Sequence, residues 1–163
     1  DSLSDIVIIS FHGGAEGPQY QHVPRSNELF HGENRGNVYQ FAHTVIDAGA
    51  DIVFGHGPHV VRGVEVYKDR FVAYSLGNFC TYGGINVSGI NGFAPIIKVY
   101  TNARGVFFKG KITSGIQNFR APVSLDSQKL AIKKIRDLTK DDFNDPILLI
   151  DDNGWIKKST IPR

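Results

Sequence analysis

The sequence predicts a mixed α/β layered sandwich with parallel strands in its first part and antiparallel strands in its second. Two short aliphatic runs flank a segment with a helical apolar period, and later β-rich segments come in pairs joined by polar turns. The composition, 41% hydrophobic and 21% charged over 163 residues, is ordinary for one globular domain. We expect residues 1–163 to form a single partial domain, with a strand-helix-strand and hairpin region in 1–79 and antiparallel strands plus one helix in 80–163.

The first region is predicted to form a strand, a helix and a second strand. Ile6–Ser10 is an aliphatic run without alternation, which is typical of a strand buried on both faces of a parallel sheet. Ile52–Phe54 is a second such run, and strands joined through a helix are parallel. Between them, Gly49 is the expected C-terminal stop of a helix whose apolar stripe comprises Val38, Phe41, Ala42, Val45 and Ile46.

Two hairpins are expected next. Val64–Tyr67 and Phe71–Ser75 flank one polar turn, and Pro95–Thr101 and Val106–Thr113 flank another.

A second helix and a last strand pair complete the chain. Ser124 or Asp126 is the expected cap of the helix, and Ile147–Ile150 pairs with Trp155–Lys157. The apolar positions of this helix are Leu130, Ile132, Ile135 and Leu138.

Two long segments lack a period. Glu16–Asn37 is polar with several Gly and Pro residues, and Leu76–Gly92 is rich in glycine, so both are expected to be loops. Because loops of this length in compact domains are usually functional or disordered, the first is a candidate lid or substrate wall.

Bulk properties exclude several classes of function. A net charge of +2 with dispersed Lys and Arg does not indicate nucleic-acid binding, and no apolar run reaches the roughly 20 residues of a membrane span. Cys80 is the only cysteine, so no internal disulfide is expected. The chain contains no methionine, and its first strand follows Asp1 almost at once, from which we expect a piece of a longer protein.

Histidines follow both strands of the first region. His12 and His56 each come two residues after a predicted strand, and parallel neighbours end at the same edge of a sheet. His59 needs only a local turn at Gly57-Pro58 to join them. Imidazoles converging in this way predict a metal site. The remaining histidines, His22, His31 and His43, are expected to be ordinary loop or helix residues.

The runs SFHGGAE and DAGADIVFGHGPHVVRGVEVYKDRFVAYSLGNF resemble the C-terminal half of poly-γ-glutamate capsule biosynthesis proteins of the CapA type. These are similar to calcineurin-like metallophosphoesterases. The resemblance implies that His12, His56, His59 and Glu16 bind divalent Mn, Zn or Fe, two ions being present in the full-length protein, and it places Asn78 in the family-like YSLGNF run. The family commonly has larger residues at the positions of Gly13 and Gly57.

Two classes of function follow from the resemblance. In the first, the whole protein is a metal-dependent phosphoesterase-like hydrolase or transferase of phosphoryl or acyl groups, with His56 at the catalytic centre. Arg62, Arg25 and Asn78 are then the candidate substrate-binding residues. In the second, the protein binds or assembles an anionic polymer without chemistry, and the piece itself is inactive.

The superfamily's Asp-x-His, Gly-Asp and Asn-His metal motifs do not occur in the chain, so we expect the N-terminal half of the fold to be missing. A sheet edge left unpaired would favour a homodimer. The expected partner is an anionic polymer or phosphate-type substrate, and the resemblance implies an extracytoplasmic location at the cell envelope.

Overall fold

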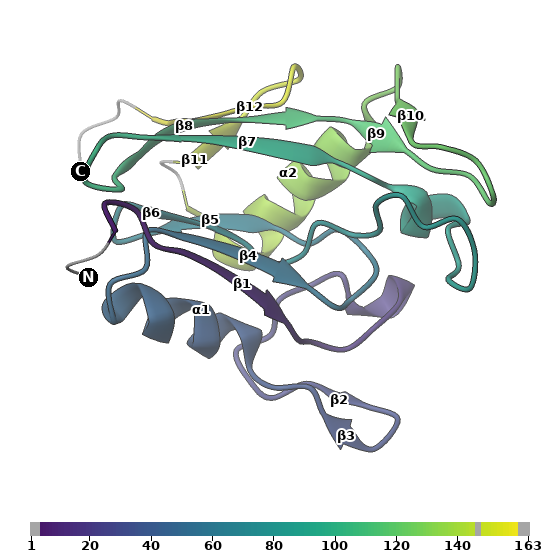
Figure 1. Cartoon of the computed structure of the whole chain (residues 1–163), viewed down its shortest axis with the longest axis horizontal. Helices are drawn as coiled ribbons and strands as arrows, with labels where there is room; N and C mark the ends of the chain where they lie inside the picture. Colours follow the sequence, from purple (N-terminus) through teal and green to yellow (C-terminus); the bar gives the residue numbers. More distant parts are fainter. Residues whose placement is uncertain (1–3, 146–147, 160–163) are drawn as a thin grey trace.

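A computed structural model describes residues 4–145 and 148–159, which form two main sheets and two α-helices (Figure 1). The first sheet has the strand order β1-β4-β6-β5. Its strands are β1 (Ile8–His12), β4 (Ile52–His56), β5 (Val64–Tyr67) and β6 (Arg70–Ala73). β4 pairs in parallel with both β1 and β6, whereas β5 and β6 form an antiparallel hairpin. The parallel unit and the first hairpin are therefore confirmed.

The second sheet is antiparallel, with the order β11-β12-β8-β7. Its strands are β7 (Ile96–Thr101), β8 (Phe107–Thr113), β11 (Leu148–Ile150) and β12 (Trp155–Lys158). The second hairpin and the closing strand pair are confirmed, although Ile147 of the predicted strand lies outside the described residues.

Helix α1 (Val38–Asp47) contains the predicted apolar stripe and ends just before the predicted stop at Gly49. The side chain of Asn37 accepts a hydrogen bond from the Gln40 N–H at 2.9 Å, which satisfies one of the free amides of the first turn. Gly49 follows the helix with φ 111°, a backbone conformation that side chains disfavour.

Helix α2 (Leu130–Phe143) has a less regular start. Lys129 holds the N-cap position in the left-handed region, and the cap is supplied from further back, where Asp126 Oδ2 accepts from the Leu130 N–H at 2.6 Å. Ser124, the other candidate cap, belongs instead to β10 (Ser124–Leu125), which pairs with β9 (Gly115–Ile116).

The two predicted loops are mostly irregular. The first contains the 3₁₀ turn η1 (Pro18–Tyr20) and a small hairpin of β2 (Leu29–Phe30) and β3 (Glu33–Asn34). The second contains only the 3₁₀ turn η2 (Gly89–Gly92). None of the helices in the described part of the chain is long and apolar enough to cross a membrane.

The central strands β4 and β6 are buried on both faces because they lie between two layers (Figure 1). Side chains alternate along a strand, so Val53 and Val72 pack against α1, while Ile52 and Phe71 pack toward the second sheet and α2. The ring of Phe71 stacks on that of Phe107 at a centroid distance of 5.2 Å, which joins the two sheets.

The prediction that the first strand is buried on both faces was wrong. β1 is an edge strand with alternating exposure, and Ile8 is 56% exposed. The aliphatic run looked central because sequence shows how apolar a strand is but not how many neighbours it has.

Arg62 was expected to contact substrate, but its side chain is buried. Its guanidinium is fully enclosed and donates to both carboxylate oxygens of Glu28, at 2.8 and 2.6 Å. It also donates to the carbonyls of Tyr20 and Ala15, at 2.9 and 3.3 Å. Because every side of the guanidinium is occupied by the loop before α1, Arg62 anchors this loop and is not available to a ligand.

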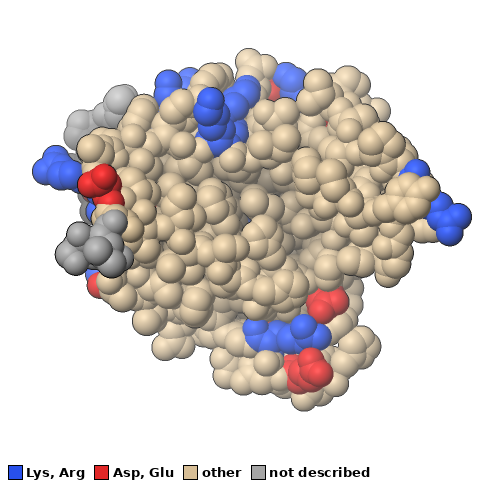
Figure 2. Space-filling view, in the orientation of Figure 1, with Lys and Arg blue, Asp and Glu red and all other residues tan. Residues whose placement is uncertain are grey.

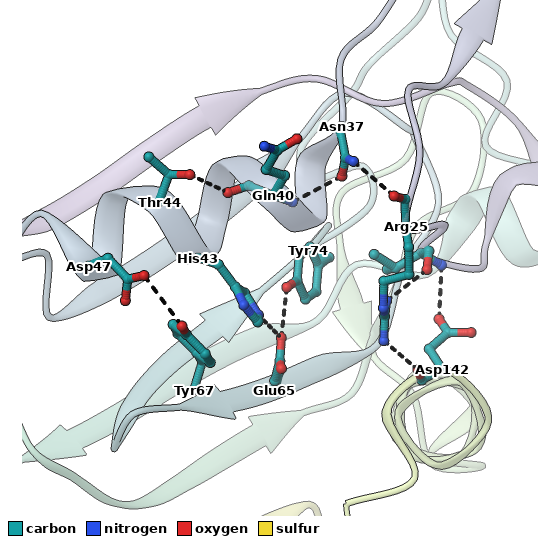
Figure 3. Close-up of polar contacts among 11 residues, drawn as sticks. Arg25, Asn37, Gln40, His43, Thr44, Asp47, Glu65, Tyr67, Tyr74 and Asp142 are labelled. Carbon is teal, nitrogen blue, oxygen red and sulfur yellow. Dashed lines mark hydrogen bonds and ion pairs between the residues drawn. The ribbon is translucent and has the colours of Figure 1, made fainter.

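Arg25, the other arginine expected to contact substrate, joins the loop before α1 to the end of α2 (Figure 3). It donates to the carbonyls of Val23 and Asp142 and lies 3.8 Å above the ring centroid of Tyr39. These contacts tie the loop before α1 to the end of α2.

His43 lies in a polar cluster between α1 and the first hairpin (Figure 3). Glu65 Oε2 accepts from the Tyr74 hydroxyl at 2.7 Å and lies 3.0 Å from His43 Nε2. Burial and then the Glu65 charge raise the pKa of Tyr74, so its hydroxyl stays protonated as the donor.

We predict that Glu28→Gln lowers the free energy of unfolding by about 3–5 kcal/mol, because it leaves the buried Arg62 guanidinium without a counter-charge. Urea unfolding measures the loss. Glu33→Gln, which removes a surface carboxylate 3.1 Å from Arg35, is the matched control and should cost no more than about 1 kcal/mol. Equal effects of the two variants would contradict the anchoring role of Arg62.

Candidate functional site

The candidate site lies where β1 and β4 end side by side. The strands pair in register, with His12 opposite His56, and the Gly13 N–H donates to the His56 carbonyl at 2.8 Å. The prediction that both histidines reach one edge of the sheet is confirmed. They are the last residues of their strands rather than two residues beyond, because each strand runs further than its aliphatic run.

The turn after β4 packs against the segment after β1. Gly57 has φ 121°, and a Cβ there would lie 2.7 Å from the Gly13 carbonyl oxygen. The Gly17 N–H donates to the Pro58 carbonyl at 2.9 Å. A larger residue at Gly57 would push the two segments apart, so glycine here permits their close contact.

Asn78 orients His59. The Asn78 amide nitrogen donates to the carbonyls of His59 and Asn91, both at 3.0 Å, which leaves its Oδ1 as an acceptor 2.7 Å from His59 Nδ1. The Nδ1 atom must then carry the proton, and Nε2 is the nitrogen left to face a ligand. His59 has φ 57°, an uncommon conformation for its residue type that this contact pair supports.

Glu16 lies between His59 and an arginine. Its Oε2 atom is 3.8 Å from His59 Nε2, and its Oε1 atom is 3.2 Å from Arg35 Nη1. A carboxylate oxygen and an unprotonated imidazole nitrogen are both acceptors, so a cation or a proton is needed to make this pair favourable.

The four predicted metal ligands occupy one edge, but they are not gathered around a single point. His12 and His56 are neighbours in register, and His59 faces Glu16. Among residues 4–145 and 148–159, no three His, Cys, Asp or Glu side chains are close enough together to hold one ion. Side-chain rotation, including release of Glu16 from Arg35, is required before the four could share an ion.

The two strand-end histidines differ in their surroundings. His56 is half-buried whereas His12 is exposed. Burial, followed by the neighbouring charge of His12, lowers the pKa of His56, which favours the neutral imidazole.

Two pockets flank the histidines. One of about 360 Å³ includes Ser10, His56 and Phe79 and lies between the two sheets. The other, of about 340 Å³, includes His12, Arg35 and Phe41, beside the start of α1. Figure 2 shows the region between the levels of β1 and β7 as a hollow with few charged side chains.

The substrate-binding residues expected from sequence are not at these pockets. Asn78 is only 4% exposed and contacts His59, while Arg62 and Arg25 hold the loop before α1. The arginine that reaches the site is Arg35, which the sequence did not single out. Its position in an irregular loop gives no periodic signal, and only the fold brings it beside Glu16.

Comparison with known proteins supports the resemblance. The family described as bacterial capsule synthesis protein PGA_cap matches residues 1–82. The PGA biosynthesis protein CapA of Bacillus subtilis is 40% identical over 76 residues, which cover 47% of this chain and 17% of that protein. The capsule biosynthesis protein CapA of Bacillus anthracis is 37% identical over 76 residues, covering 47% and 15%.

A probable polyglutamine synthesis accessory protein of Mycobacterium tuberculosis is 36% identical over 74 residues, 45% of this chain and 16% of that protein. The matched segment is thus a small part of each relative's length. The family match covers the half of the chain that holds His12, His56, His59 and Glu16. The chain belongs to the bacterial capsule synthesis protein (PGA_cap) family.

Proposed function

We propose that this chain carries the metal-binding edge of a protein of capsule or poly-γ-glutamate synthesis, and that the whole protein is a metal-dependent hydrolase or transferase. The relatives' names, PGA biosynthesis protein and capsule biosynthesis protein, support this process and a location at the cell envelope. The two-sheet arrangement, with parallel strands in the first sheet and antiparallel strands in the second, is compatible with a metallophosphoesterase-like sandwich.

The observation that carries the proposal is the pairing of His59 with Glu16. Asn78 holds the Nδ1–H of His59, as carboxylates and amides commonly do for metal-bound histidines. The free nitrogen then faces a carboxylate oxygen at 3.8 Å, and a divalent cation stabilises such a pair of acceptors.

The donor set suits Mn, Zn or Fe, since imidazole and carboxylate ligands bind all three. In the proposal, His12, His56, His59 and Glu16 would hold the metal, and His56 is the candidate catalytic residue. When bound, the metal would polarise a phosphoryl or acyl oxygen and activate water. The residues around it keep His59 oriented through Asn78 and hold His56 neutral through burial.

Arg35 takes the role of anion binding that the sequence suggested for Arg62 and Arg25. Arg35 and His12 line the same pocket, and the Arg35 Nη1 atom lies 3.2 Å from Glu16 Oε1. When Glu16 turns to a metal, Arg35 loses one counter-charge and can pair with a substrate carboxylate or phosphate instead.

We expect the chain to bind Mn²⁺ measurably in isothermal titration calorimetry, and His59→Ala to abolish the binding because it removes a ligand. Asn78→Ala should weaken binding about 10- to 100-fold, the usual effect of losing a residue that orients a ligand. His31→Ala, at the exposed turn between β2 and β3, is the control and should bind as the unmodified chain does. The proposal fails if the unmodified chain binds none of Mn²⁺, Zn²⁺ and Fe²⁺.

With Mn²⁺ present, Arg35→Gln should weaken binding of inorganic phosphate about 10- to 100-fold while leaving Mn²⁺ affinity within a factor of about three. Arg104→Gln, in the exposed turn between β7 and β8, is the matched control. Unchanged phosphate affinity in Arg35→Gln would assign the anion site elsewhere. Tight binding of a polyglutamate without turnover of any phosphate ester would favour the non-catalytic role.

The exposed edge of β1 supports a second proposal, a homodimer through strand pairing. Within the described residues β1 has a strand on one side only, and Ile8 is 56% exposed.

Light scattering should detect dimers at tens of micromolar, and Ile8→Lys should shift them to monomer because an edge lysine opposes pairing. Phe108→Lys, at a 51% exposed position on the inner strand β8, should leave the dimer intact. A monodisperse monomer at these concentrations contradicts the pairing.

A further inference from the structure

The outer face of the second sheet carries a regular array of lysines and aromatic residues, far in sequence from the histidines. Strand register places these side chains in two cross-strand rows on β7, β8 and β12. One row is Lys98, Lys111 and Trp155, and the other is Tyr100, Lys109 and Lys157. We call these six residues the basic face.

The basic face points away from the core because of the alternation along each strand. The residues next in sequence to the rows point the other way: Ile112 and Ile156 belong to the core that joins the two sheets, and Ile97 packs against it. In Figure 2, Lys and Arg side chains gather along the upper edge, where β7 and β8 run in Figure 1.

Each row places two lysines directly opposite one another. Lys98 faces Lys111, and Lys109 faces Lys157, an arrangement that is destabilising in a sheet. Lys157 has a carboxylate of Asp151 at 3.7 Å, and Lys111 donates to the carbonyl of Asn153. Neither Lys98 nor Lys109 pairs with a carboxylate of the part of the chain that the structure describes. The face therefore carries more positive charge than its neighbours neutralise.

The aromatic rings support the ammonium groups instead of offering open faces. Lys109 Nζ lies 4.8 Å from the Tyr100 centroid and 5.4 Å from that of Trp155, and Lys111 Nζ lies 5.0 Å from Trp155. Lys98 Nζ lies 5.3 Å from Tyr100. Single-stranded nucleic acids need uncovered rings on which to stack bases, whereas carboxylates need only the ammonium groups.

We propose that the basic face binds a polycarboxylate chain of the poly-γ-glutamate kind. Lysines about 5 Å apart across strands and about 7 Å apart along them present several ammonium groups to successive carboxylates of one flexible chain. The choice of polymer rests on the proposed function, but the face is on a different sheet from the histidines and needs no metal. It would hold the polymer while the histidine edge acts on it.

Trp155 is the only tryptophan, so its fluorescence reports on this face directly. Titration with a poly-γ-glutamate oligomer in metal-free buffer of low ionic strength should change the emission and saturate. Binding should weaken steeply as salt is added, because the contacts are ionic. No change in emission, together with no heat in calorimetry, overturns the proposal.

The double variant Lys98→Glu with Lys111→Glu should weaken oligomer binding at least 10-fold. If this variant fails to fold, the milder double variant Lys98→Gln with Lys111→Gln should also weaken oligomer binding. Lys133→Glu with Lys140→Glu, on the exposed face of α2, makes the same change in net charge and should bind nearly as the unmodified chain does. Equal losses in the two lysine pairs would mean that only net charge matters, which overturns a specific face.

Two further experiments distinguish the basic face from the histidine edge as the polymer site, and a polycarboxylate from a nucleic acid as the ligand. His56→Ala with His59→Ala should leave oligomer binding within a factor of about two even if metal binding is lost. Loss of oligomer binding in that variant would place the polymer at the histidine edge and overturn the proposal. Tighter binding of an oligo-dT strand than of the glutamate oligomer would also overturn it.

Discussion

The parallel pairing of β1 with β4 in a single register is the constraint on which the candidate site depends. A slip of one residue would turn His12 to the other side of the sheet and separate it from His56. The register is held by the backbone bond from Gly13 to His56 and by the close contact that Gly57 permits. α1 and the second sheet cover the two faces of β4, so the strand has no freedom to shift.

From this edge a chain of polar contacts runs outward through Asn78, His59, Glu16 and Arg35. Its charge balance explains how the described conformation is stable without metal. Arg35 neutralises Glu16 as it stands, and in the proposed function a divalent cation takes the place of the guanidinium once the Glu16 side chain has turned. Metal and anion binding would then be coupled, because the cation that recruits Glu16 also frees Arg35.

Two surfaces of the molecule differ strongly in their number of charged side chains. The hollow between β1 and β7 has few charged side chains (Figure 2), and the pocket between the two sheets includes His56. The outer face of the second sheet instead concentrates lysines, although the chain as a whole has a net charge of only +2. A net charge is thus a poor guide here, since strand register gathers charges that are dispersed in sequence.

Local patterns in the sequence by themselves determined the strand-helix-strand unit, the hairpins and the edge at which His12 and His56 meet, because periodicity and turn residues act over a few positions. Tertiary structure alone decided the rest. Arg62 is buried because Glu28, 34 positions away, folds back onto it. β1 is an edge because, among the described residues, the order of strands places a neighbour on one side only. Arg35 and the lysine rows likewise owe their positions to contacts between segments distant in sequence, which no local pattern encodes.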